Sequence, residues 1–222
     1  MSGFILKLIA AVTMLIDHAG LVLFPYAGWM RIVGRLAFPI FAFCIAEGFL
    51  YTRCRWKYFL RIFVLGVGCQ LVYWFAAGDT LLGILITFSI SILLMWLLDR
   101  VKTAFRENEA CRYLLAGAFI AAVAAVFVFC QNFDVDYGFF GILLPVWISV
   151  FTERPYRLAA MSLGLLGLCI AEGEITRQWW SLCALPILAL YNGKPGRYRM
   201  KYFFYIFYPA HLGILQLIDW IR

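Results

Sequence analysis

Long apolar runs, each close to the length that crosses a bilayer, follow one another along almost the whole chain. A helical run of about 20 apolar residues spans the hydrocarbon layer, and a soluble core explains only one or two such runs. The pattern therefore predicts an all-α, polytopic transmembrane helix bundle of about nine spans, forming one domain over residues 1–222. The predicted spans are 4–23, 34–51, 58–77, 80–98, 112–130, 138–151, 157–171, 177–191 and 202–221.

Composition supports the membrane prediction, because 65% of the residues are apolar and only 14% are charged. A soluble domain carries roughly a quarter charged residues. Asp17 and His18 lie inside the first run, and no small-x-small pattern follows it, which favours a retained helix over a cleaved signal peptide. The 7 cysteines are scattered without C-x-x-C spacing, so we expect neither a disulfide framework nor a metal site.

The charges of the connections alternate along the chain. The basic connections contain Arg53, Arg55, Lys57 and Arg61, then Arg100, Lys102, Arg106 and Arg112, then Arg154 and Arg157, then Lys194, Arg197, Arg199 and Lys201. The connections between them carry Asp79, Asp134 and Asp136, and Glu172 and Glu174. By the positive-inside rule, the N-terminus is cytoplasmic and the C-terminus faces outward in the inner (plasma) membrane. The net charge of +7 thus reflects topology, and we expect lipid rather than nucleic acid as the partner of this surface.

Ionisable residues inside a span are costly and usually face the protein interior or a wet cavity. The first helix carries Lys7, Asp17 and His18. Lys7 and His18 are three turns apart and share a face, with His18 toward the outer side. Asp17 and His18 project about 100° apart, so each needs a partner from another helix.

The second predicted helix carries Arg31 and Arg35 at its outer end, and Pro39 is expected to kink it. An Asp17–Arg35 pair would neutralise both charges, and a direct catalytic role for Asp17 is the alternative. Glu47 lies deeper in the same helix, where Arg53 or Arg61 is a candidate partner.

The last helix contains Tyr208-Pro209-Ala210-His211. Pro209 removes one helical hydrogen bond, and His211 follows at mid-membrane. An intramembrane histidine can simply bond a neighbouring carbonyl. A helix broken beside the histidine favours a lined cavity instead, in which a side chain that titrates near neutral pH could transfer protons.

Several stretches of the chain resemble the TraX family. They are Lys7 to Gly20 with Asp17-His18, Gly34-Arg35-Leu-Ala-Phe-Pro39, Glu47-Gly48, Asp136-Tyr137-Gly138 and Tyr208-Pro209-Ala210-His211-Leu212. The family is named for the membrane protein that acetylates the N-terminus of conjugative F-type pilin, and it is similar to polytopic acyltransferases that carry acyl groups across a membrane. The resemblance implies a membrane acetyltransferase that uses cytoplasmic acetyl-CoA.

Acyl transfer to an amine needs a base and a group that stabilises the oxyanion. We expect His18 as the base with His211 as second choice, Arg35 as the oxyanion contact, and Asp17 to orient Arg35. Arg53, Arg55, Lys57 and Arg61 are candidates for CoA phosphates, although each also fits a plain positive-inside role. Candidate contacts to a peptide or small-molecule acceptor are Arg31, Glu47, Asp136, Tyr137 and Tyr208.

Two other functions fit the same polar residues. A small proton-coupled transporter or flippase would use the intramembrane Asp, His, Arg and Glu side chains as a proton or substrate path. A non-catalytic pilus or envelope assembly factor would need none of them for chemistry. Acetyl-CoA turnover by the purified protein separates the enzyme from the transporter.

Overall fold

The fold was analysed in a computed structural model, which describes residues 1–78, 80–171, 177–196 and 201–221. Every secondary-structure element among these residues is a helix, in agreement with the all-α prediction. The residues fall into two compact units, of which the first comprises Met1–Cys44 with Glu153–Arg222 and the second Ile45–Thr152. Part of the charge alternation lies outside the described residues, at Asp79, Glu172, Glu174, Arg197, Arg199 and Arg222.

Five helical segments are long and apolar enough to cross a membrane: Gly3–Val22, Gly28–Tyr51, Arg55–Phe75, Ile84–Arg106 and Arg112–Asn132. Gly138–Val150 and Ile206–Ile221 are shorter apolar helices. Apolar side chains on α1 (Gly3–Val22) divide between two faces: Leu6, Ala10 and Met14 are buried, whereas Ile5 and Val12 are exposed. An exposed apolar stripe of this kind suits contact with lipid tails rather than water.

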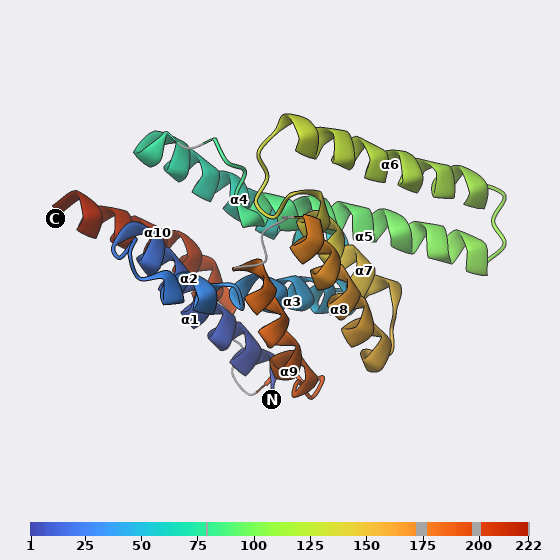
Figure 1. The fold of residues 1–222 in the computed structure, drawn as a ribbon. Coiled ribbons are helices and arrows are strands. Elements are labelled where there is room, and N and C mark those ends of the chain that lie inside the picture. The colour runs from blue at the N-terminus through green and yellow to red at the C-terminus, as the bar shows by residue number, and fades with distance from the viewer. Residues whose placement is uncertain (79, 172–176, 197–200, 222) are drawn as a thin grey trace. The chain divides into compact units, whose positions relative to one another are not determined.

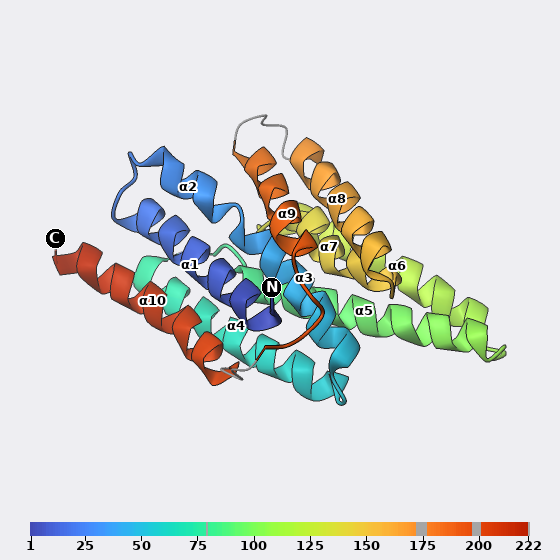
Figure 2. The same cartoon turned by 90° about the horizontal axis from the view of Figure 1, so that it is seen from below.

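In the first unit, α1 lies beside α2 (Gly28–Gly34) and α10 (Lys201–Ile221), as both views show (Figures 1 and 2). Gly3 and Phe4 donate backbone hydrogen bonds to Lys194 O and Pro195 O at 2.8 and 3.0 Å. These bonds satisfy N–H groups that the first turn of α1 would otherwise leave without a partner. They also hold the start of α1 against the segment that precedes α10.

The second predicted helix is divided in the structure. It forms α2 and α3 (Ala37–Tyr51), and the chain turns at Arg35 and Leu36. Pro39 has no N–H and would clash with the carbonyl four residues earlier, so it is accommodated in the first turn of a new helix. The predicted interruption is therefore present, but it lies before Pro39 rather than at it.

The prediction of one regular helix over 177–191 is wrong. The chain forms a 3₁₀ helix, η1 (Gln178–Cys183), followed by the short α9 (Ala184–Ala189). At about 2.0 and 1.5 Å per residue, the two together extend roughly 21 Å, which is less than the hydrocarbon thickness of about 30 Å. They pack with α8 (Arg154–Ala171), where Met161, Leu165 and Leu168 are buried.

In the second unit, α5 (Ile84–Arg106) packs against α4 (Arg55–Ala77), α6 (Arg112–Asn132) and α7 (Gly138–Val150) (Figure 1). The predicted span 80–98 is longer at its C-terminal end in the structure, because α5 continues to Arg106. α6 has no buried residue among those described, as suits a helix surrounded largely by lipid.

Candidate functional site

Two histidines from opposite ends of the chain meet in the first unit. His18 of α1 places Nδ1 2.8 Å from Nε2 of His211 on α10. The rings are nearly parallel, with an interplanar angle of 8°. Since the nitrogens are closer than the roughly 3.5 Å contact distance of stacked carbon faces, the rings meet edge to edge through a hydrogen bond. His211 is buried and His18 is partly buried.

The hydrogen bonds determine which nitrogens carry protons. Nδ1 of His211 lies 2.7 Å from the carbonyl oxygen of Phe207. A carbonyl only accepts, so this Nδ1 is the donor and Nε2 of a neutral His211 is an acceptor. The proton between the rings therefore belongs to Nδ1 of His18. In this arrangement Nε2 of His18 keeps a lone pair, and it can act as a base.

Of the two alternatives for His211, a bond to a neighbouring carbonyl is present, at Phe207 O, whereas the lined cavity stays a prediction. The ring of Tyr208 lies edge-on to His211, with centroids 5.7 Å apart. Tyr208 thus lies next to His211, and its predicted contact with an acceptor stays a prediction. His18 and His211 are not alternatives for one role, because they form a single hydrogen-bonded unit.

Asp17 faces α2 and forms an ion pair with Arg31. Arg31 Nη1 lies 2.6 Å from Asp17 Oδ2 and 3.3 Å from the backbone oxygen of the same residue. The predicted Asp17–Arg35 pair is therefore wrong. Asp17 and His18 bond to different helices, as their spacing on α1 predicted.

A glycine makes room for this ion pair. A Cβ atom added to Gly34 would lie 2.0 Å from Asp17 Oδ1, so the carboxylate occupies the space of the missing side chain. At the same helix contact, Gly20 of α1 lies against Met30, where an added Cβ would be 2.7 Å from Met30 Cβ. The two glycines allow α1 and α2 to approach closely.

Arg35 is directed to a residue that the sequence analysis missed. Its Nη1 donates to Oε1 of Gln178 at 3.3 Å. Arg35 follows the last residue of α2, and the two arginines have different partners, Asp17 for Arg31 and Gln178 for Arg35. The charges of both arginines act on Asp17, and that of Arg31 also acts on His18. Asp17 and Arg31 thus join α1 to α2, whereas Arg35 contacts η1 through Gln178.

The signal for Gln178 was weak. It is one polar residue at the start of a short apolar segment, next to Trp179 and Trp180. Only its burial, at 3% exposed, identifies it as part of a polar site.

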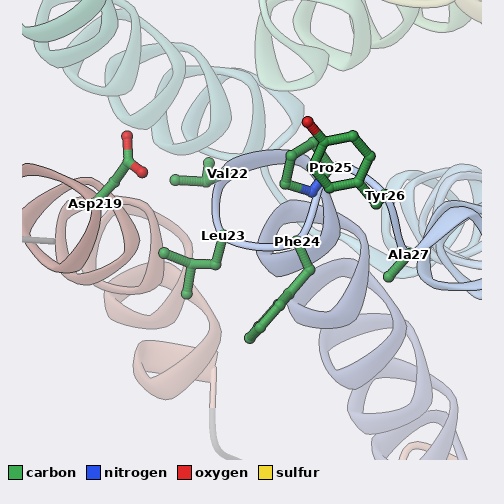
Figure 3. A pocket seen from close by; sticks show the side chains of 7 residues that line it. All are labelled: Val22, Leu23, Phe24, Pro25, Tyr26, Ala27 and Asp219. Carbon is green, nitrogen blue, oxygen red and sulfur yellow. The ribbon is translucent and has the colours of Figure 1, made fainter.

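A pocket of about 580 Å³ lies beside the C-terminal ends of α1 and α10 in the first unit. Its lining comes from Val22, the last residue of α1, from the following residues 23–27, and from Asp219 near the end of α10 (Figure 3). Val22 is one helical turn beyond His18 on the same face of α1. The pocket combines apolar side chains with one carboxylate.

The remaining predicted residues lie in the second unit. Arg55 forms an ion pair with Asp99 and lies over the ring of Phe49, at 4.8 Å from the ring centroid. Arg53, Lys57 and Arg61 are exposed. Glu47 is partly buried on α3, and its predicted pairing with Arg53 or Arg61 stays a prediction.

Asp136 and Tyr137 lie in the turn before α7, where the backbone is fixed. Asp136 N–H donates to Leu82 O at 2.9 Å, and Thr87 Oγ1 donates to Asp136 O at 3.0 Å. Tyr137 has a positive φ of 60° at the start of α7. These bonds give the turn a structural role. The contact of Asp136 and Tyr137 with an acyl acceptor stays a prediction.

Five helical segments that are long and apolar enough to cross a membrane, with a polar cluster between α1, α2 and α10, are typical of a membrane protein. The family described as TraX protein matches residues 2–219. The chain therefore belongs to the TraX family.

Two relatives extend the comparison. The chain is 29% identical over 238 aligned residues to the probable fimbrial assembly protein FimC, serogroup H1, of Dichelobacter nodosus, covering 96% of this chain and 94% of that protein. It is also 40% identical over 67 residues to an uncharacterised protein of Rickettsia prowazekii, covering 30% of this chain and 25% of that protein. No solved structure matches the chain.

Proposed function

We propose that the protein is a membrane-embedded acetyltransferase, which moves an acetyl group from cytoplasmic acetyl-CoA to an outward-facing acceptor. The hydrogen bond between His18 and His211 carries this proposal. A base in acyl transfer must hold a lone pair toward the reacting group, and its other nitrogen must be oriented by a third group. The bond to His211 supplies the orienting contact, and we assign the free lone pair of His18 Nε2 to the reacting group, with His18 as the base and His211 as the positioning residue.

The proposed reaction joins an acceptor amine to the acetyl carbon. The amine nitrogen attacks the thioester carbonyl, and its proton passes to Nε2 of His18. The carbonyl electrons move onto oxygen and return when the carbon–sulfur bond breaks. The thiolate of CoA then takes the proton from His18, so that the products are an amide and free CoA. His211 Nε2 stabilises the positive charge on His18 by accepting its Nδ1 proton in a hydrogen bond.

The donor and the acceptor would approach from opposite sides of the inner membrane. Arg53, Lys57 and Arg61 are exposed basic side chains that fit CoA phosphates. Arg55 is the weakest candidate of this group, because Asp99 already pairs with it. The 580 Å³ pocket with Asp219 is the proposed entrance for the acceptor, whose ammonium group would complement the carboxylate.

A multi-pass topology with the N-terminus inside and the C-terminus outside serves this reaction. It requires the chain to cross the membrane through η1 and α9, which together extend only roughly 21 Å. Contacts within each unit agree with that sidedness. The start of α1 forms hydrogen bonds with Lys194 and Pro195. This contact requires the N-terminus and the connection before α10 to lie on the same side of the membrane, and the proposed topology places both in the cytoplasm. In the second unit, Leu82 pairs with Asp134 and Asp136, in two connections that the topology places outside.

Family membership supports an acceptor of the pilin type. The FimC relative is described as a probable fimbrial assembly protein, which fits modification of a pilus subunit or another envelope peptide. The same description also favours a second candidate function, that of a non-catalytic assembly factor. The two functions differ in whether acetyl-CoA is consumed.

Purified protein in proteoliposomes tests the proposal. Isotope-labelled acetyl-CoA is supplied on one side and a short peptide with a free N-terminal amine on the other. The proposal predicts labelled peptide and an equal amount of free CoA. Lumenal pH changes without acetylated peptide would instead indicate a proton-coupled transporter, and neither signal would favour the assembly factor.

A further inference from the structure

Gln178 has a defined orientation in the first unit. It begins η1, is 3% exposed, and accepts a hydrogen bond from Arg35 Nη1. A guanidinium only donates hydrogen bonds, so the amide atom that faces Arg35 must be the oxygen. The NH₂ group of Gln178 therefore points to a different part of the site.

Two donors in this pair of side chains are buried without a hydrogen-bond partner among the described residues. They are Nε2 of Gln178 and Nε of Arg35. Leaving a buried donor without a partner is unfavourable, and native proteins rarely do so without a functional reason. Arg35 and Gln178 are joined by their own hydrogen bond, so the two donors belong to one cluster of polar side chains.

The charges indicate which acceptor fits. Arg31 is neutralised by Asp17, whereas Arg35 makes no ion pair within the described part of the chain. Asp17 Oδ1 lies in the space beside Gly34 and forms no hydrogen bond with Arg35 among the described residues. A partly buried guanidinium with a spare donor, next to a spare amide donor, suits an oxygen that carries or develops negative charge.

We propose that Gln178 is a catalytic residue, which binds the carbonyl oxygen of the acetyl thioester together with Arg35. This inference rests on the proposed acetyl transfer and adds to it the second donor of the oxyanion site. When the amine attacks, the carbonyl electron pair moves onto this oxygen, and Nε2 of Gln178 and Nε of Arg35 donate to it. When the carbon–sulfur bond breaks, the pair returns to form the amide carbonyl, and both hydrogen bonds weaken.

A purely structural role for Gln178 makes a different prediction. If the residue only holds Arg35 through Oε1, then Gln178→Glu should preserve that role, since a carboxylate accepts from a guanidinium at least as well. The same change removes the Nε2 donor and places negative charge beside the developing oxyanion. Gln178→Met, in contrast, removes both functions while keeping the length of the side chain.

The test measures kcat and the KM for acetyl-CoA in proteoliposomes, together with the thermal stability of each variant. Loss of one oxyanion donor typically lowers kcat by about 10²–10³-fold. We expect a fall of that size in Gln178→Glu, with KM and thermal stability close to wild type, and an equal or larger fall in Gln178→Met. Ser181→Ala is the matched control, because Ser181 is fully buried on the same 3₁₀ helix, and it should keep wild-type kcat.

Near-native kcat in folded Gln178→Glu would overturn the inference while leaving the acetyltransferase proposal intact. If both variants lose thermal stability and their kcat falls only in proportion to the fraction of protein that is unfolded, the inference is also overturned, in favour of a structural role. A wild-type protein that transfers no acetyl group removes the proposed function itself, and this inference with it.

Discussion

His18 and His211 are 193 positions apart in the chain, yet their imidazoles share a hydrogen bond of 2.8 Å inside the first unit. The bond to Phe207 O fixes the proton on His211 Nδ1, so His211 Nε2 accepts the hydrogen bond that His18 Nδ1 donates. Lys7 shares the His18 face of α1 but is exposed near the other end of the helix. The site thus depends on the contact between α1 and α10.

The first prediction concerns the positioning role of His211. His211→Leu cannot accept the Nδ1 proton of His18, so the rate of acetyl transfer should fall by on the order of 10²-fold. His211→Gln offers an amide oxygen in its place and should recover part of the rate. Initial rates of labelled peptide formation measure both. Equal rates for the two variants would show that hydrogen bonding by His211 does not matter.

A second prediction distinguishes the two arginines. Asp17 and Arg31 are 16% and 21% exposed, so breaking their pair should cost about 1–3 kcal/mol, less than for a fully buried pair. Asp17→Asn combined with Arg31→Gln should therefore lose less stability than the sum of the two single changes. The double-mutant cycle of Asp17→Asn with Arg35→Gln is the control, and its two losses of stability should be closer to additive. Stronger coupling to Arg35, measured by unfolding in detergent, would contradict the observed pairing.

The close approach of α1 and α2 gives a third prediction. Gly34→Ala adds a Cβ atom 2.0 Å from Asp17 Oδ1, which forces the helices apart or displaces the carboxylate. Overpacking of this kind costs about 1–3 kcal/mol, and transfer activity should fall with it. Gly28→Ala is the control in the same helix, because nothing lies within 4 Å of the added atom. Thermal unfolding should separate the two variants, and equal stability would argue against the tight contact.

Topology provides a fourth prediction. A reporter fused after Arg222 should lie outside the cytoplasm, and a reporter inserted between residues 192 and 201 should lie inside it, because basic connections stay inside. Alkaline phosphatase and fluorescent-protein fusions measure the two positions. A cytoplasmic C-terminus would change the number of spans and the proposed sides of donor and acceptor.

The sequence was most informative where the apolar pattern alone decides the structure. The predicted spans 112–130 and 138–151 differ little from α6 and α7, since length and hydropathy define them. The need of Asp17 and His18 for separate partners also followed from helix geometry. The pattern was least informative at 177–191, where a short apolar segment fits a regular span and a 3₁₀ helix equally well.

The identities of the partners could not be read from the sequence. Whether Asp17 meets Arg31 or Arg35 depends on how α1, α2 and η1 pack, which brings Arg31 to Asp17 and Arg35 to Gln178. The pairing of His18 with His211 needs the packing of α10 on α1, for which the local sequence carries no signal. Gln178 was missed for the same reason, because its significance comes from burial.

The most direct test of the proposed chemistry is the rate of labelled acetyl transfer by His18→Gln relative to wild type. The glutamine amide can still donate to His211 Nε2, so the contact between α1 and α10 is kept, but an amide cannot take a proton near neutral pH. Loss of a general base typically lowers the rate by about 10²–10⁴-fold, and we predict a fall in that range with normal yield and CoA binding. Near-native transfer by His18→Gln would contradict the assignment of His18 as the base, and with it the mechanism proposed for this protein.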